Sequence, residues 1–399
     1  MHRRTVGISL PLLILAGAFL MGQPQDSLAQ QAPAPAADAA ATLPEDEALR
    51  PFVMPQSGPF HAEAIAIANN AAIMAWARSG HSDARAPAFS HWDAAGEIPP
   101  NCSVCHSGAG FRSFHGLDGS APGLPETPIP TGGVVDCETC HSPRLSEVRE
   151  VRMTSGVMHS VAGVEVACAT CHQSRAAGIT VANAVGEREA DTPDPDLAFI
   201  NPHYATATST WLGGFGASGY HYPGKDYAGR FFHARPVATC VSCHEPHTLQ
   251  VATETCLTCH ETGNPRDIRL SRQSHDGSGN LSVGIRADIE GLAARLMDSM
   301  LAYAREVASV PMIFDPHRHP YFFADANGDG VVDQVDGVAV QYNAFTPRLL
   351  RAAFNWKLVT ADHGAYAHNP HYALQLLYDS IEDLSGPLGS DIADLGPRR

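Results

Sequence analysis

The stretch Cys240-Val-Ser-Cys243-His244-Glu-Pro-His247, followed closely by Cys256-Leu-Thr-Cys259-His260, carries the pattern that decides the fold. Two cysteines separated by two residues and followed at once by histidine occur five times in the chain. The other copies are Cys102-Ser-Val-Cys105-His106, Cys137-Glu-Thr-Cys140-His141 and Cys168-Ala-Thr-Cys171-His172. All ten cysteines lie in these five motifs, so one chemistry has to account for every thiol.

The five motifs match the attachment signature of c-type haem. Two thiols reach the two vinyl groups of one porphyrin, and the next residue places an imidazole on the iron. The sequence therefore predicts five covalent haem c groups, whose proximal iron ligands are His106, His141, His172, His244 and His260. A disulfide framework gives no reason for the histidine after every pair. A zinc ribbon needs four ligands for each ion, and these cysteine pairs do not divide evenly among such sites.

The second axial ligand of each iron decides between electron transfer and catalysis. An iron with two imidazoles exchanges electrons, whereas an iron with an open position can bind a substrate. His247 follows Pro246, which stiffens the step from His244 and should direct this imidazole towards a neighbouring haem. Six histidines are the favoured distal ligands: His81, His91, His203, His233, His247 and His368. Three more are weaker candidates: His115, His159 and His221.

These motifs, together with Trp76-Ala-Arg-Ser-Gly-His81 and Phe89-Ser-His91-Trp92, resemble multihaem c-type cytochromes of the bacterial periplasm and cell surface. The stretch Asp362-His-Gly-Ala-Tyr-Ala-His-Asn-Pro is similar to the start of the C-terminal helix of the nitrite reductase and hydroxylamine oxidoreductase superfamily. The resemblance covers most of residues 60–385 and implies a distal-ligand role for His368, and similarly for His81 and His247. Nitrite reductases of that family usually carry Lys in one attachment motif, whereas all five motifs here end in His.

The N-terminus has the features of an export signal. A basic start is followed by an apolar run over residues 6–21 and by small residues at 27–29, which predicts a secretory signal peptide over residues 1–29. An uncleaved membrane anchor is the alternative. Residues 30–50 are rich in Ala and Pro and predict a flexible linker. The net charge of −16 argues against a protein that neutralises nucleic-acid phosphates.

The predicted fold is mainly α with high loop content, a multihaem cytochrome c fold built around five covalent haems. Residues 51–281 form the pentahaem-binding region. The whole chain has 35 Gly and 30 Pro, a composition that favours loops around a largely porphyrin interior. Residues 282–385 form a helical C-terminal region packed on the haem core, and residues 386–399 an irregular tail. The 16-residue step between the fourth and fifth motifs should place two haems close together.

Local signals place the C-terminal helices. Apolar residues recur at helical spacing over residues 285–303, and Pro311 should end this long helix. Thr346-Pro347 and Asn369-Pro370 each predict a helix start, with the first residue as cap and proline in the first turn. The 72-residue step between the third and fourth motifs is either a lid or an excursion that delivers His203 and His233 as ligands; the excursion is favoured because it supplies missing ligands.

Residues 325–336 match a twelve-residue calcium loop. The predicted ligands are Asp325, Asn327, Asp329, the carbonyl oxygen of Val331, Asp333 and Asp336. Asp336 stands where such loops usually have Glu, and its shorter side chain reaches the ion less well. A surface turn rich in Asp, Asn and Gly is the alternative. If Ca²⁺ binds, we expect a weak structural site.

The favoured function is electron transfer through five mostly bis-histidine haems in the periplasm or at the cell surface. The partners would be redox proteins or terminal electron acceptors, with no nucleic acid and no membrane span after signal cleavage. The alternative is a haem-dependent oxidoreductase of a small nitrogen or sulfur compound with one open iron. Assembly into an oligomer or a haem filament is a further, weaker possibility that the sequence does not test.

Overall fold

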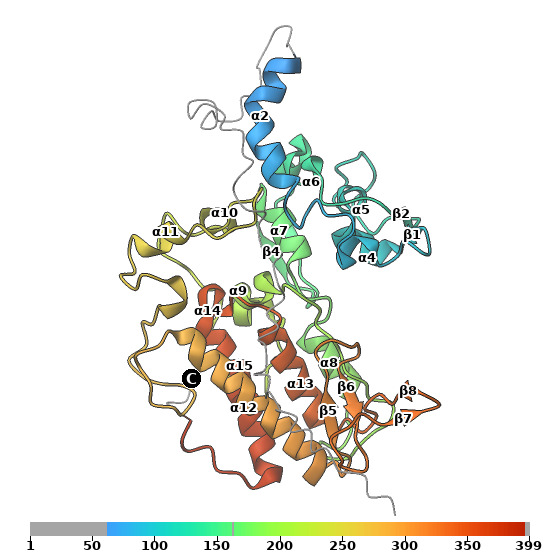
Figure 1. Ribbon diagram of the computed structural model, residues 1–399, viewed down its shortest axis with the longest axis vertical. Coiled ribbons are helices and arrows are strands. Elements are labelled where there is room, and N and C mark those ends of the chain that lie inside the picture. Colours follow the sequence, from blue (N-terminus) through green and yellow to red (C-terminus); the bar gives the residue numbers. More distant parts are fainter. Residues whose placement is uncertain (1–61, 162, 396–399) are drawn as a thin grey trace, which may run out of the picture. The chain divides into compact units, whose positions relative to one another are not determined.

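The computed structural model describes residues 62–161 and 163–395 (Figure 1). The predicted signal peptide and linker lie outside the described residues, as does the end of the tail. The chain divides into two units at Ala71, within the first described helix, and every contact reported below lies in the second unit. No helix among the described residues is both long and apolar enough to cross a membrane.

Helices and loops make up most of the described chain, and the strands are short. The longer helices are α2 (Ala62–Trp76), α12 (Ile285–Glu306), α13 (Pro347–Thr360) and α15 (Pro370–Leu388). The shorter ones are α3 (Pro87–Ser90), α4 (Pro100–His106), α5 (Gly108–Phe114), α6 (Cys137–His141), α7 (Glu165–Cys171), α8 (Gly178–Val185), α9 (Ala207–Gly216), α10 (Cys240–Cys243), α11 (Thr253–Leu257) and α14 (Ala365–His368). The prediction of a mainly α protein with many loops is confirmed.

The described strands pair only as antiparallel two-stranded ribbons. They are β1 (Glu97–Ile98) with β2 (Ile129–Pro130), β3 (Glu150–Arg152) with β4 (Met158–Ser160), β5 (Met312–Phe314) with β6 (Phe322–Ala324), and β7 (Gln334–Val335) with β8 (Val338–Ala339). Val151 pairs with His159 in the second of these ribbons. Ribbons this short are marginal alone, so they depend on packing against helices.

The three long C-terminal helices α12, α13 and α15 pack against one another (Figure 1). The predicted caps are confirmed: Thr346 accepts a hydrogen bond from the Leu349 N–H, and Asn369 accepts one from the Tyr372 N–H. The long helix ends at Glu306, five residues before Pro311. The last helix continues to Leu388, so the first residues of the predicted irregular tail are helical.

The larger apolar core surrounds these helices and draws on both sides of the predicted boundary at residue 282. Tyr220, which comes from the long step between motifs, is buried in the same core as Leu296 and Leu377. The Asn355 side chain accepts from the Tyr220 N–H and donates to its carbonyl oxygen. Gly178 lies so close to Gly219 that a Cβ there would be 2.1 Å from the Gly219 oxygen. The segment between the third and fourth motifs is therefore packed against the C-terminal helices.

A second, smaller apolar cluster lies under the first three motifs. It joins Phe111 of α5, Leu145 and Val151 to Val166 of α7, with Cys140 partly buried against it. Few large side chains contribute, as the polar and glycine-rich sequence of this region predicts. The attachment region therefore has little apolar core of its own, whereas the C-terminal helices have a large one.

Candidate functional site

All five cysteine–histidine motifs lie on or at the end of short helical turns, in α4, α6, α7, α10 and α11. Residues three apart on a helix share a face, so the two cysteines of one motif project from the same side of the turn. In the second motif Asp136 caps the turn by accepting from the Thr139 N–H at 3.1 Å. None of the ten cysteines forms a disulfide. Each motif therefore offers two adjacent thiols for attachment.

Each motif histidine faces a second histidine at nearly the same distance. The ring-centroid separations are 5.8 Å for His106–His203, 6.0 Å for His141–His247, 6.3 Å for His172–His81, 6.3 Å for His244–His368 and 6.2 Å for His260–His233. No second histidine is shared between two motifs. The structure thus brings five of the six favoured distal candidates opposite a motif histidine, each at a different motif.

This spacing fits one metal ion between two imidazoles. Histidine nitrogens bind zinc at about 2.0–2.1 Å, and a metal at that distance from both nitrogens puts the two ring centroids roughly 6 Å apart. Haem iron takes axial histidine ligands on its two faces. The residues present therefore fit five axially ligated haem irons, with two thiols beside each.

Hydrogen bonds determine which nitrogen is free in three of these histidines. A carbonyl oxygen can only accept, so a ring nitrogen bonded to it carries the proton and leaves the lone pair on the other nitrogen. The free nitrogen in each case is Nε2, and a second hydrogen-bond partner of this kind orients metal-binding histidines. The Nδ1 donors and carbonyl acceptors are His106 to Ala88 (2.6 Å), His172 to Ala205 (3.2 Å) and His233 to Ala234 (3.3 Å).

Burial favours the neutral form of several paired histidines. It lowers the pKa of His81 to about 4, with a further contribution from the charge of His172. It likewise lowers the pKa of His203 to about 4, and the positive charge of Arg175 acts in the same direction. Burial also lowers the pKa of His244. A metal binds only the unprotonated nitrogen, so these imidazoles are ready to act as ligands near neutral pH.

His368 differs, because a buried carboxylate contacts it. Both oxygens of Asp362 lie 2.9 Å from His368 Nδ1. Burial alone would lower the pKa of His368, but the charge of Asp362 and its hydrogen bond raise the pKa above its ordinary value. Sequence analysis assigned no role to Asp362. The available signal was its position six residues before a candidate ligand, in a loop rather than on a periodic apolar face.

His91 is not brought opposite a motif histidine. Its exposed ring lies edge-on to Trp92 at 4.7 Å, and Trp92 in turn lies 5.2 Å from His106. The weaker candidates have other partners as well. His115 is 3.0 Å from the Thr170 hydroxyl, His159 packs on Trp211 at 5.4 Å, and His221 is 2.9 Å from the Tyr372 hydroxyl.

Neighbouring attachment helices contact one another directly. Cys105 Sγ lies 3.6 Å from the Thr170 oxygen, and Cys171 Sγ lies 4.0 Å from the Val104 oxygen, so α4 and α7 meet through their cysteine ends. The Cys240 N–H donates to Glu165 at 3.0 Å and joins α10 to the start of α7. The helix α7 therefore contacts attachment helices on two sides.

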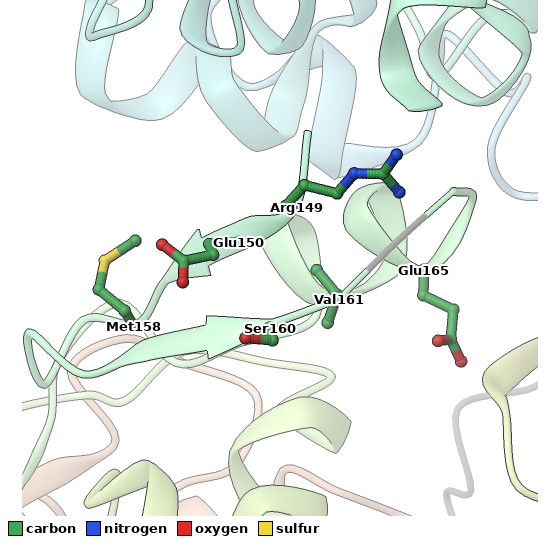
Figure 2. A pocket seen from close by; sticks show the side chains of 6 residues that line it. All are labelled: Arg149, Glu150, Met158, Ser160, Val161 and Glu165. Atoms are coloured by element: carbon green, nitrogen blue, oxygen red, sulfur yellow. The ribbon is translucent and has the colours of Figure 1, made fainter. Parts of the chain in front are cut away.

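An open cavity of about 750 Å³ lies between the β3–β4 ribbon and the beginning of α7 (Figure 2). Arg149, Glu150 and Glu165 supply its charged groups, and Met158 and Val161 supply apolar surface. Its volume is typical of ligand sites. No motif histidine or paired histidine lines it, so it lies beside the third motif without belonging to a histidine pair.

The calcium-loop sequence, residues 325–336, begins directly after β6 and contains β7, so strands rather than helices adjoin it. The carboxylate of Asp325 accepts from the Asp329 and Gly330 N–H groups, each at 3.0 Å. Asp336 lies in the turn between β7 and β8 with a φ of 51°. Within residues 62–161 and 163–395, no three histidine, cysteine or acidic side chains are gathered so as to hold a metal ion. Calcium binding therefore stays a prediction.

Five cysteine pairs, each beside two histidines about 6 Å apart, are the arrangement expected of a multihaem c-type cytochrome, and the comparison with known proteins agrees: the chain is similar to proteins of that class. Residues 224–386 match the cytochrome c552 family, a range that includes the last two motifs and His368. No solved structure gives a significant match.

Curated relatives extend the likeness to most of the chain. The C-type polyheme cytochrome OmcC of Geobacter sulfurreducens (strain ATCC 51573 / DSM 12127 / PCA) is 27% identical over 79% of this chain and 47% of its own. The C-type polyheme cytochrome OmcB of Geobacter sulfurreducens (strain DL-1 / KN400) is 27% identical over 82% of this chain and 49% of its own. The chain thus spans about half the length of the curated relatives it matches.

Proposed function

We propose that the chain holds five haem c groups and transfers electrons between redox partners through them. Each group would be attached to one cysteine pair and ligated by one motif histidine and the histidine that faces it. The observation that carries the proposal is the pairing of histidines: each of the five motif histidines has its own partner histidine, with the ring centroids about 6 Å apart. When bound, haem iron supplies a one-electron couple.

The chain's own residues would hold these groups rigidly and close to one another. Carbonyl oxygens orient His106, His172 and His233 by accepting from Nδ1, and they leave Nε2 of each ring free to bind the metal. The contacts of α7 with α4 and α10 put the third attachment site next to the first and next to the fourth, which provides a route between the first and third groups although they are not consecutive in the chain. Fixed ligands also reduce the rearrangement that accompanies each change of charge.

The pairing favours a carrier over an enzyme with an open iron. A catalyst in this class keeps one axial position free for its substrate. Each of the five motif histidines here has an imidazole in the position that a substrate would need. The relatives are named polyheme cytochromes, which agrees with electron transfer.

We place the protein outside the cytoplasm, in the periplasm or at the cell surface, because the export-like N-terminus and the covalent haem motifs point the same way. Its redox partners would meet an acidic protein, since the formal net charge is −16. Such a charge favours encounter with basic protein surfaces or with positively charged acceptors.

Haem content and iron spin state test the proposal. Mass spectrometry of the purified holoprotein should show five added haem groups, and electron paramagnetic resonance of the oxidised protein should show only low-spin iron. Fewer than five groups would refute the count. A high-spin signal from one fifth of the iron, responsive to an added small nitrogen or sulfur compound, would favour the enzyme instead.

A further inference from the structure

The hydrogen-bond partner of Nδ1 separates one histidine pair from the others. His106, His172 and His233 donate to neutral carbonyl oxygens. Two second-ligand histidines contact carboxylates instead: His247 contacts Glu245 at 3.1 Å, and His368 contacts Asp362 at 2.9 Å. The Glu245 side chain is 46% exposed, whereas that of Asp362 is 4% exposed. A buried charge is screened far less than an exposed one.

The fold holds Asp362 firmly against the ring of His368. The Gly364 N–H donates to Asp362 Oδ1 at 3.0 Å, in the loop between α13 and α14. A Cβ at Gly364 would lie 2.6 Å from His368 Cε1, so only glycine lets the imidazole approach this backbone. The His368 ring is therefore fixed on two sides: the Asp362 carboxylate accepts from Nδ1, and the backbone of Gly364 lies against the ring.

No lysine or arginine forms an ion pair with Asp362 in the described part of the chain. Its one charged partner is His368. Arg286 lines a small cavity together with Asp362, but its guanidinium pairs with Glu290 at 2.7 Å. An unbalanced buried carboxylate is costly, so a positive centre has to lie nearby. The metal that His368 would bind with His244 supplies that charge.

We propose that Asp362 is a positioning residue that makes His368 an electron-rich ligand, and that it thereby gives the haem attached at Cys240 and Cys243 the lowest reduction potential of the five. This inference rests on the proposed function. The oxidised iron carries one more positive charge than the reduced iron, and the fixed negative charge of Asp362 favours the oxidised state. The step is the gain or loss of one electron, and it involves no proton. Hydrogen bonds that metal-binding histidines donate to carboxylates raise the basicity of the ligand in the same way.

The test is a potentiometric titration of the oxidised holoprotein, followed by visible absorbance and electron paramagnetic resonance. Asp362→Asn keeps an oxygen that accepts from Nδ1 but removes the charge, so it separates charge from orientation. We expect one low-spin component, the lowest in potential, to move to higher potential by more than any of the other four, among which the third motif is also within reach of the Asp362 charge through His172. Glu245→Gln is the matched control, and it should shift its component less because Glu245 is exposed.

His368→Met identifies the component. In this variant the lowest-potential component of the wild-type titration should be the one that changes its spectrum. Five unchanged potentials in Asp362→Asn would overturn the inference, as would a largest shift in a component that His368→Met leaves intact. If Asp362→Asn loses haem or low-spin iron, Asp362 has a structural role. The assignment of the lowest potential to this haem then stands only if His368→Met changes the lowest-potential component. Failure of the proposed function would appear earlier, as a wild-type protein without five low-spin haems.

Discussion

His203 and His91 lie near the same motif histidine, His106, and we expect opposite results when each is replaced. His203 faces His106 at 5.8 Å between ring centroids, whereas His91 is exposed and lies against Trp92. His203→Ala should therefore remove the second ligand of one iron, and His91→Ala should remove none. The thioether attachment does not involve His203, so the haem should stay bound in both variants.

The size of the effect follows from the number of pairs. One open site among five converts one fifth of the iron, about 20%, to a species that binds external ligands. Spin quantitation of the oxidised protein and carbon monoxide titration of the reduced protein should both give one site per chain for His203→Ala. Added imidazole should restore the low-spin signal, because it replaces the missing side chain. The wild type and His91→Ala should give no such site.

Two results would refute this reasoning. If His203→Ala stays wholly low-spin, then His203 is not the ligand or another side chain takes its position. If His91→Ala instead yields the open site, the pairing in the structure is wrong at the first motif. Haem loss in either variant is detected by mass, so an unfolded protein is not mistaken for an open iron.

Three further predictions concern stability. Leu296→Ala in the fully buried face of α12 should cost about 2–5 kcal/mol of unfolding free energy and lower Tm, as a cavity in a packed core does; an unchanged Tm would contradict the packing of α12. Haem-free protein should lose the ordered structure of residues 100–172 and 240–260 in hydrogen exchange while α12, α13 and α15 keep more protection, since the larger core lies there; uniform protection would argue that haem does not organise the attachment region. Millimolar Ca²⁺ should raise Tm relative to a chelator if residues 325–336 bind it, and a flat Tm would remove the site.

The sequence predicts well what a few adjacent residues decide. Each cysteine–histidine motif is complete within five residues, and the caps at Thr346 and Asn369 need only the next three residues. The pairing of ligands is different, because His172 lies 91 residues from His81 in the chain. Spacing and composition could raise both His91 and His203 as candidates, but only tertiary packing distinguishes them. Sequence reasoning could not decide which imidazole meets which motif for the same reason.

The burial of two core tyrosines and of Asp362 could not be predicted from the sequence for a similar reason. Tyr220 and Tyr222 pack with the C-terminal helices although they lie in a glycine-rich stretch without apolar periodicity. Asn355, which lies 135 residues from Tyr220 in the chain, bonds the Tyr220 backbone and ties this stretch to α13. Asp362 gains its importance from being enclosed next to His368, and burial of a loop carboxylate leaves no pattern in the sequence.

The same ligand pairs that would carry electrons also join distant parts of a chain that has little apolar core around its motifs. His141–His247 closes 106 residues and His244–His368 closes 124, whereas His260–His233 closes 27. Loop-closure entropy grows as (3/2)RT ln n, so a ligand pair that closes 124 residues offsets roughly 1 kcal/mol more unfolded-chain entropy than a pair that closes 27. The His141–His247 closure starts beside the smaller apolar cluster, which Cys140 contacts, and the His244–His368 closure ties the fourth motif to the C-terminal helices and their larger core. If the proposed function holds, ligand pairing and folding are one problem in this protein, because a segment with little core of its own would be held by the metal bonds that electron transfer requires.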